Sequence, residues 1–234
     1  MTSAVIVAAG KGTRMKYKPN ISKQHIDILG KSVVLRTIEK FVEAESIDEI
    51  ILVIIKEEEE YFRNKVLNLI ETDKPIKLVY GGKERVYSCY NGIMATNKNT
   101  DVVLVHDGVR PFVKTSEINE VVRVSKETGA AVLAVKSKDT IKIAPSNIIE
   151  HTPDRDNVYM IQTPQGFSKK TLVEAYEKLI SSESDFVPTD DASVVENYGQ
   201  KVRIVEGSYE NIKITTLSDV VLAEAILKSE VLFA

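Results

Sequence analysis

The chain has 234 residues, of which 43% are hydrophobic and 28% charged, a balance typical of a globular protein with a substantial core. Its formal net charge of −3 excludes a strong overall attraction to nucleic acid or to an anionic membrane. Cys89 is the single cysteine, which excludes an intramolecular disulfide and favours a reducing compartment. No apolar run approaches the roughly 20 residues of a membrane helix, and no signal peptide pattern opens the chain, so we expect a cytoplasmic protein.

Short apolar runs alternate with helical patterns along most of the chain. The predicted strands are 4–9, 49–55, 76–80, 102–106, 130–135 and 202–206. Their apolar character is continuous, as is typical of strands covered on both faces. The predicted helices carry apolar faces within 34–42, 62–70, 115–129 and 172–180, and a last helix follows Ser218. We therefore expect an α/β fold, a Rossmann-like and mainly parallel sheet with helices on both faces, whose ligands bind beyond the carboxyl ends of the strands.

One segment departs from this rhythm. Residues 136–160 have turn signals and no helical period, which predicts an extended arm or hairpin that projects from the sheet. Neither a repeat nor a linker divides the rest, so we interpret 1–234 as one domain.

Glycines and cations follow the first predicted strand, in "VAAGKGTRM" (7–15). Glycines at 10 and 12 allow backbone N–H groups to converge on an anion, and Arg14 adds a forked, charged donor. The loop is neither a dinucleotide fingerprint, because Met15 replaces the third glycine, nor a Walker A loop, whose first glycine is missing. The alternative is a simple turn with a solvated Arg14.

Two later loops offer similar chemistry. Lys23 lies nine residues beyond Arg14, so it could meet the same anion. The alternative is an ordinary surface lysine. In "GGKERVYS" (81–88), Gly82 permits close backbone approach, and Arg85 and Ser88 lie within one turn if a helix starts there. The alternative for this loop is a glycine turn followed by a helix cap.

Asp107 ends the apolar strand in "VLVHDGVRP" (103–111). A carboxylate is costly there unless it binds a cation or is hydrogen-bonded, so Asp107 is a candidate Mg²⁺ ligand. The alternative is an ion pair with Arg110, and we expect His106 to be structural.

Two further stretches, "IQTPQGF" (161–167) and "TDDASVVE" (189–196), are interpreted as packed loops with more carboxylates. Charge at a helix N-terminus is the favoured role for at least one of Asp190 and Asp191. Lys213, within strand-like residues, points either to solvent or into the ligand cleft.

The order of these motifs along the chain closely resembles the 2-C-methyl-D-erythritol 4-phosphate cytidylyltransferases. The resemblance runs from Val5 to about Glu224 through A-A-G-x-G-x-R-M, K-Q, G-G-x-x-R-x-x-S, V-H-D-x-x-R-P, T-P-Q-x-F, T-D-D-A and N-x-K-I-T-T. It implies transfer of CMP from CTP to a polyol phosphate, with release of pyrophosphate and with Mg²⁺, in isoprenoid precursor biosynthesis. No general base is required, because the acceptor phosphate is already an anionic nucleophile.

The resemblance also implies roles for individual residues. CTP would be bound by Ala8, Ala9, Gly10, Lys11, Gly12, Gly82, Arg85 and Ser88. Arg14 and Lys23 would stabilise the transition state at the α-phosphorus, and Arg155 and Lys213 would join them as catalytic residues. The acceptor would be held by Asp107, Arg110, Thr140, Arg155 and Lys213, with Asp107 beside the metal. The implied state is a homodimer in which arm 136–160 carries Thr140 and Arg155 into the partner's site.

Some positions depart from the family pattern. Ser22 precedes Lys23 where proline is usual, the 16–22 loop is longer than usual, Gly108 replaces a common alanine, and Leu217 stands where proline often occurs. One alternative is the sister ribitol-5-phosphate cytidylyltransferases, whose usual runs are H-D-S-V-R-P and T-D-A-C; "TDDASVVE" matches the erythritol family better. A catalytically silent CTP-binding module is the other, and the joint presence of Arg14, Lys23, Asp107 and Lys213 argues against it.

Overall fold

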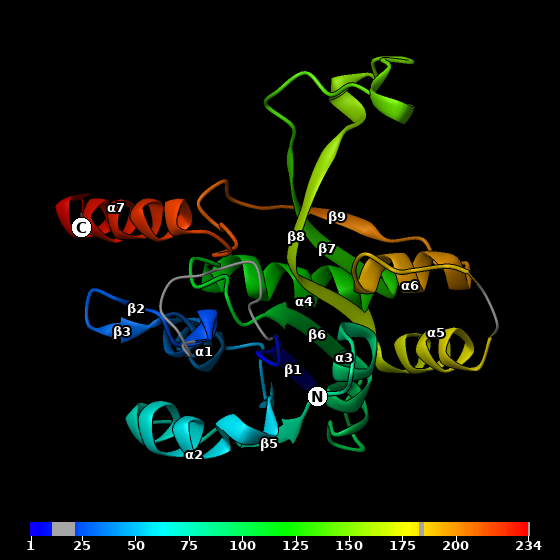
Figure 1. Ribbon diagram of the computed structural model, residues 1–234. Coiled ribbons are helices and arrows are strands. Elements are labelled where there is room, and N and C mark those ends of the chain that lie inside the picture. Colours follow the sequence, from blue (N-terminus) through cyan, green and yellow to red (C-terminus); the bar gives the residue numbers. More distant parts are fainter. Residues whose placement is uncertain (11–21, 183–184, 234) are drawn as a thin grey trace.

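A seven-stranded sheet forms the centre of the described part of the chain, in the order β5-β4-β1-β6-β8-β7-β9. The computed structural model describes residues 1–10, 22–182 and 185–233 (Figure 1). The strands are β1 (Thr2–Val7), β4 (Glu49–Ile54), β5 (Ile76–Tyr80), β6 (Val102–Asp107), β7 (Ala130–Lys136), β8 (Tyr159–Ser168) and β9 (Arg203–Glu206). Among these strands only β8 runs antiparallel to its neighbours, which confirms the predicted mainly parallel sheet.

Helices cover both faces of the sheet, as the sequence predicted. The helices are α1 (Val33–Glu43), α2 (Glu59–Tyr61), α3 (Arg85–Met94), α4 (Thr115–Thr128), α5 (Lys169–Ser181), α6 (Asp191–Tyr198) and α7 (Leu217–Phe233). Successive strand residues point to opposite faces: Ile6 joins the core under α1 and α4, whereas Val5 joins the core under α3, α5 and α6. Each face therefore has its own apolar core.

A third, smaller core lies beside the sheet. The hairpin of β2 (Asp27–Ile28) and β3 (Lys31–Ser32) packs against α7, with Ile28, Val220 and Ile226 in one buried cluster. This packing joins the last helix to the segment that follows the first strand.

The region predicted as a helix over 62–70 is less regular than expected. It divides into a π-helical turn, Phe62–Val66, and a 3₁₀ turn, Leu67–Leu69. Phe62 and Val66 are buried, but Leu69 is 62% exposed. The change of helical period rotates Leu69 away from the predicted apolar face.

The prediction of a loop at 161–167 is wrong, because these residues belong to β8. A polar strand interrupted by proline lacks the apolar run that indicates a buried strand. The pairing with β7 shifts register between Val132 and Ala134, opposite Pro164, so the missing N–H falls at an irregularity. The strand-like stretch around Lys213 is not in a strand either, although Ile214 N–H donates to the Val109 carbonyl at 2.9 Å.

The predicted arm is present. β7 and β8 continue beyond the sheet and carry 136–160 away from the rest of the protein (Figure 1). Its regular pairing is sparse: Ser137 N–H donates to the Val158 carbonyl at 3.0 Å, and an isolated bridge joins Ile143 and His151. Such a segment has little core of its own.

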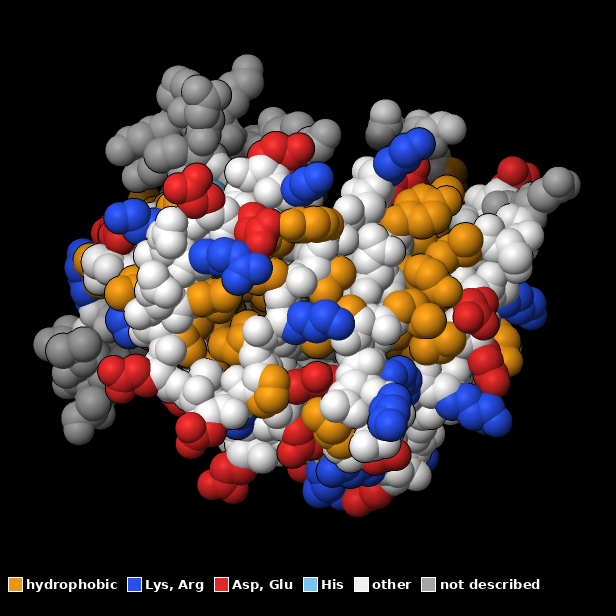
Figure 2. Space-filling model, turned by 90° about the horizontal axis from the view of Figure 1, so that it is seen from below, with side chains coloured by type: hydrophobic (Ala, Val, Ile, Leu, Met, Phe, Trp, Pro, Cys, Tyr) orange, Lys and Arg blue, Asp and Glu red, His pale blue; other side chains and the backbone are white. Residues whose placement is uncertain are grey.

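Charges of both signs are interspersed on the face opposite the arm, where Figure 2 shows no continuous field of one sign. This distribution agrees with the small net charge of −3. No helix in the described part of the chain combines the length and the apolar character that crossing a membrane requires.

Candidate active site

A cavity of about 400 Å³ lies at the carboxyl ends of the central strands. In the sheet register Val7 pairs with Val53 on one side and with Asp107 on the other, so the loops after β1, β4 and β6 meet at one edge. The cavity is lined by Val7, Ala8, Ala9, Gly10, Gln24, Gly82, Lys83, Glu84, Arg85, Ser88, Asp107, Val109 and Lys213. A cleft at this edge is where an open α/β sheet binds its ligand.

The glycine loop after β5 packs closely against the loop after β1. A Cβ at Gly81 would lie 2.5 Å from the Cβ of Ala9, so only glycine fits there. Gly82 N–H donates to Ser88 Oγ at 3.0 Å, and this hydroxyl donates to the Glu84 carbonyl at 3.1 Å. The predicted first helical turn with Arg85 and Ser88 is confirmed as the start of α3.

Three cations surround the carboxylate of Asp107. Lys213 Nζ lies 2.8 Å from Oδ2, Arg110 Nε lies 3.6 Å from Oδ2, and Arg85 Nη2 lies 3.8 Å from Oδ1. Burial by itself would raise the pKa of Asp107, but Lys213 and Arg85 outweigh it and hold this pKa well below its usual range. Asp107 is therefore ionised at neutral pH. Lys213 lines the cavity, and Arg110 pairs with Asp107.

A chain of hydrogen bonds supports Asp107 from behind. Its backbone N–H donates to Thr163 Oγ1 at 3.1 Å, and Thr163 Oγ1 lies 3.0 Å from Nδ1 of His106. His106 Nε2 lies 3.1 Å from the Arg110 carbonyl. Because burial lowers the pKa of His106 to about 4, the ring is neutral at pH 7. A carbonyl only accepts, so Nε2 carries the proton, and Nδ1 accepts from Thr163. These contacts support the structural interpretation of His106.

Arg85 is held by a carboxylate that sequence reasoning did not connect with it. Arg85 Nη2 donates to Asp191 Oδ2 at 2.6 Å, and Tyr176 Oη donates to Asp191 Oδ1 at 2.5 Å. Asp191 is fully buried, and its charge raises the pKa of Arg85. Asp190 instead caps α6, accepting from Ser193 N–H at 2.9 Å, which confirms the capping role for one of the two aspartates.

Four predicted residues fall on positions or side chains that the structure does not describe. Lys11, Gly12 and Arg14 lie outside the described residues. Lys23 lies in the 3₁₀ turn Lys23–His25, and its side chain is outside the described part as well. Its neighbour Gln24, which sequence reasoning noted only as part of a motif, lines the cavity and donates to the Ala8 carbonyl at 2.9 Å.

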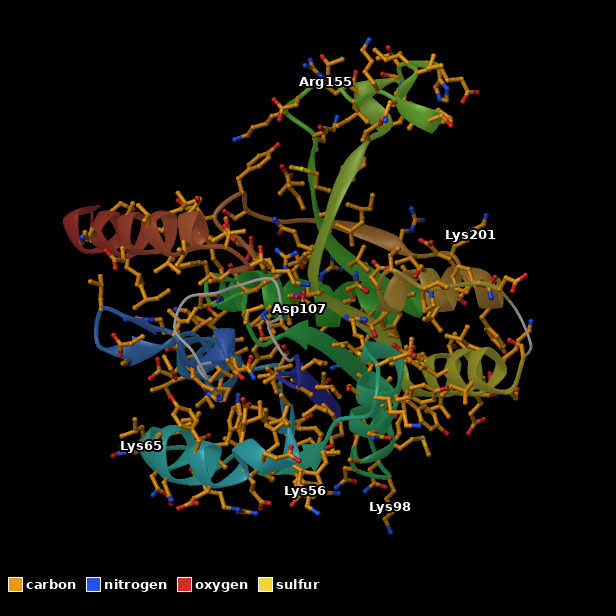
Figure 3. All side chains as sticks on the ribbon, viewed as in Figure 1. Lys56, Lys65, Lys98, Asp107, Arg155 and Lys201 are labelled. Atoms are coloured by element: carbon orange, nitrogen blue, oxygen red, sulfur yellow. The ribbon has the colours of Figure 1, made fainter. Side chains whose placement is uncertain are left out.

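Thr140 and Arg155 are exposed on the arm. Figure 3 shows Arg155 near the far end of the arm, well away from Asp107 at the centre of the molecule. Within one chain, Arg155 and Asp107 therefore do not form a common site.

The described residues do not form a metal centre of their own. No three His, Cys, Asp or Glu side chains gather there in a way that could hold a metal ion. Two carboxylates line the cavity, those of Glu84 and Asp107, and the oxygens of Asp107 already face Lys213, Arg110 and Arg85. This donor set suits a metal that enters with an anionic ligand better than a resident ion.

Comparison with known families gives one clear match. Residues 2–229 match the family model described as IspD, 2-C-methyl-D-erythritol 4-phosphate cytidylyltransferase. A protein of that name from Clostridioides difficile is 46% identical over 230 residues, which are 98% of this chain and 95% of the relative. Another from Caldanaerobacter subterraneus is also 46% identical, over 97% of this chain and 98% of the relative.

Solved structures agree with these relatives. The crystal structure of the 4-diphosphocytidyl-2C-methyl-D-erythritol synthase of Anaerococcus prevotii has a TM-score of 0.86 and 39% identity, covering 97% of this chain and 96% of that one. The 2-C-methyl-D-erythritol 4-phosphate cytidylyltransferase of Francisella tularensis has a TM-score of 0.78 and 30% identity, with coverages of 96% and 98%.

Proposed function

Because this chain belongs to the 2-C-methyl-D-erythritol 4-phosphate cytidylyltransferase family, we propose that the cavity beside Asp107 is where it carries out that family's reaction. The chain is a nucleotidyltransferase that joins CMP from CTP to 2-C-methyl-D-erythritol 4-phosphate. An oxygen of the acceptor phosphate bonds to the α-phosphorus of CTP, and the bond from that phosphorus to the bridging oxygen breaks. Pyrophosphate leaves with those electrons.

The observation that carries this proposal is the concentration of cations around one ionised carboxylate. Both substrates are anions, and Lys213 and Arg85 face the cavity beside Asp107. Asp107 keeps the two cations in place while the site is empty. When the acceptor phosphate enters, Lys213 exchanges part of this ion pair for the phosphate, so little reorganisation is needed.

The glycine loop and α3 form the proposed nucleotide side of the cavity. Residues 8–10 and 82 line the cavity, and all four are alanine or glycine, whose small size favours close approach of a triphosphate to the backbone. Arg85 and Ser88, at the start of α3, face the same space and take the cytidine end in this proposal. Arg14 and Lys23 keep their predicted roles at the α-phosphorus.

Magnesium is proposed to arrive with the triphosphate. When bound, it neutralises charge on the phosphate oxygens. The triphosphate would supply most of its ligands, and Asp107 is the carboxylate that the family resemblance places beside the metal. The contacts of Asp107 favour its ion-pair role, so direct ligation of Mg²⁺ stays a prediction from the sequence.

The arm is proposed to complete the site of a second protomer. Arg155 lies on the arm, well away from Asp107 of its own chain (Figure 3). Thr140 is exposed on the same arm, which has little core of its own. A guanidinium binds phosphate through two parallel hydrogen bonds, which suits Arg155 to the acceptor phosphate of the partner's site. The resulting assembly is a homodimer with two-fold symmetry.

An assay of pyrophosphate release from CTP tests the function. We expect release with 2-C-methyl-D-erythritol 4-phosphate and little with ribitol 5-phosphate. Lys213→Ala should lose activity, with Lys201→Ala, an exposed lysine remote from the cavity, as control (Figure 3). Faster release with ribitol 5-phosphate would contradict the acceptor assignment, and full activity of Lys213→Ala would contradict the assigned cavity.

A further inference from the structure

Glu58 contacts all three residues around Lys23 whose side chains the structure describes. Ser22 Oγ donates to Oε1 of Glu58, and Gln24 Nε2 donates to Oε2 at 2.9 Å. His25 Nε2 lies 3.1 Å from the same Oε2. One carboxylate therefore accepts hydrogen bonds from the residue before Lys23 and the residue after it, and it also lies at ion-pair distance from His25.

The environment of Glu58 makes these contacts strong. Its side chain is only 18% exposed and that of His25 only 10%. Burial by itself would raise the pKa of Glu58, but the interactions with His25 and Ser22 outweigh burial and lower this pKa. Glu58 is therefore ionised at neutral pH, and hydrogen bonds to an ionised acceptor are stronger than neutral ones.

The same cluster is tied to the sheet. Glu58 ends the turn Lys56–Glu58, which is separated from β4 only by Ile55. Gln24 Nε2 also donates to the Ala8 carbonyl at 2.9 Å, at the end of β1 and on the wall of the cavity. The ring of His25 packs at a centroid distance of 3.9 Å on Tyr61. The backbone of the Lys23–His25 turn is thus fixed against rigid elements.

We propose that Glu58 is a positioning residue that fixes the backbone from which Lys23 extends. This inference rests on the proposed function, in which Lys23 meets charge at the α-phosphorus. The mechanism needs alignment more than covalent chemistry, and a misplacement of about 1 Å can cost about 10²-fold in rate. Glu58 supplies that alignment without touching the substrates.

The run of four glutamates at 57–60 provides a matched control. Glu57 is exposed, and its side chain makes no hydrogen bond or ion pair with any described residue. Glu57→Ala therefore removes the same charge one position away and leaves the cluster intact. Glu58→Gln keeps the size of the side chain and one carbonyl oxygen but loses the charge. It replaces Glu58→Ala in the measurements if Glu58→Ala does not fold.

The first measurement is amide hydrogen exchange, which does not depend on activity. Faster exchange is expected across 22–28 in Glu58→Ala, with a smaller effect in Glu58→Gln and none in Glu57→Ala. Exchange elsewhere, as in β1, should stay as in the wild type. Unchanged exchange at 22–28 in both Glu58 variants would overturn the anchoring role.

The second measurement is a kinetic double-mutant cycle with Lys23→Ala. Glu58→Ala should lower kcat about 10- to 10²-fold with little change in KM for CTP. The double variant should be no slower than Lys23→Ala alone, because both changes remove the same contribution. If the kcat of the double variant instead falls by the product of the two single losses, the changes act independently and the positioning role is overturned. Normal kcat in Lys23→Ala would instead refute the proposed role of Lys23, and the exchange result would still report the anchoring separately.

Discussion

Asp107 shows how one residue can organise a site through charge alone. Its ionised carboxylate faces Lys213, Arg110 and Arg85 at 2.8 to 3.8 Å, and its backbone is held through Thr163. Removing that charge leaves three neighbouring cations that repel one another. Loss of one partner in a buried ion pair typically costs about 3–5 kcal/mol.

We therefore predict that Asp107→Asn lowers the free energy of unfolding by about 3 kcal/mol at pH 7, because the amide keeps the size but not the charge. Urea titration of both proteins measures this. Residual turnover should show the same Mg²⁺ midpoint as the wild type, since the cations occupy the carboxylate. A Mg²⁺ midpoint moved to higher concentration would instead establish Asp107 as a metal ligand.

The two aspartates of "TDDASVVE" should separate cleanly by mutation. Asp190→Ala removes a helix cap, at a cost of about 1 kcal/mol in stability. Asp191→Ala leaves Arg85 without its buried partner and should cost about 3 kcal/mol, near the lower end because the Arg85 side chain is 36% exposed. It should also raise KM for CTP in an initial-rate assay, whereas Asp190→Ala should change KM little. Equal effects of the two variants on both quantities would argue against the Arg85 pairing.

His106 makes stability depend on pH. Its pKa falls from 6.5 in the unfolded chain to about 4 in the folded protein, so the unfolded state binds the extra proton between these values. Stability from neutral His106 is full above about pH 6.5 and is lost as the pH falls toward 4. The loss is about 3 kcal/mol, since each pKa unit is worth about 1.4 kcal/mol.

Chemical denaturation at several pH values between 7 and 4 measures this slope. His106→Gln, which cannot titrate, should flatten the curve across this window, although it is less stable at pH 7. An equally steep curve in His106→Gln would assign the dependence to other groups.

At the scale of elements, the sequence predicted what burial controls. Strands β1, β4, β6 and β7 are apolar on both sides and were recognised from that pattern. β8 was missed because several of its buried residues are polar. Gln165, for example, donates to Asp190 at 2.7 Å and accepts from Ala192 N–H at 2.9 Å. Such a strand is stabilised by partners far along the chain, which local patterns do not reveal.

The same limit applies to the site. Loops at the carboxyl ends of β1, β5 and β6 were expected to meet, because parallel strands end at one edge. The contact between Arg85 and Asp191 joins residues 106 positions apart, and it depends on how α3 and α6 pack. No spacing rule indicates such a pair.

The arm carries a prediction of its own. Ile148 is 73% exposed and Ile149 62% exposed, an unusual placement for two adjacent isoleucines. If the arm holds two protomers together, Ile148→Asp should weaken the dimer, because it places a charge in an apolar contact.

Sedimentation over a range of concentrations would measure the change. Leu69→Asp, at an exposed leucine away from the arm, should leave the wild-type dimer intact. A wild-type protein that stays monomeric at every concentration would refute the dimer itself.

At the scale of the whole molecule, the proposed dimer implies that one chain carries the parts of two half-sites. The cavity with Asp107 and Lys213 lies at the sheet edge, while Arg155 lies on the projecting arm (Figure 3). This separation is the reason to expect that activity belongs to the dimer and not to the single chain.

Subunit complementation tests this central claim most directly. Lys23→Ala and Arg155→Ala should each be inactive as pure proteins, the loss being about 10²–10³-fold when one transition-state donor is removed. In a mixed dimer one site carries both changes and the other carries neither. Random exchange makes about half of the dimers mixed, so about a quarter of wild-type pyrophosphate release should return. If exchange is demonstrated with differently labelled subunits and activity stays at the level of the pure variants, the shared site is contradicted.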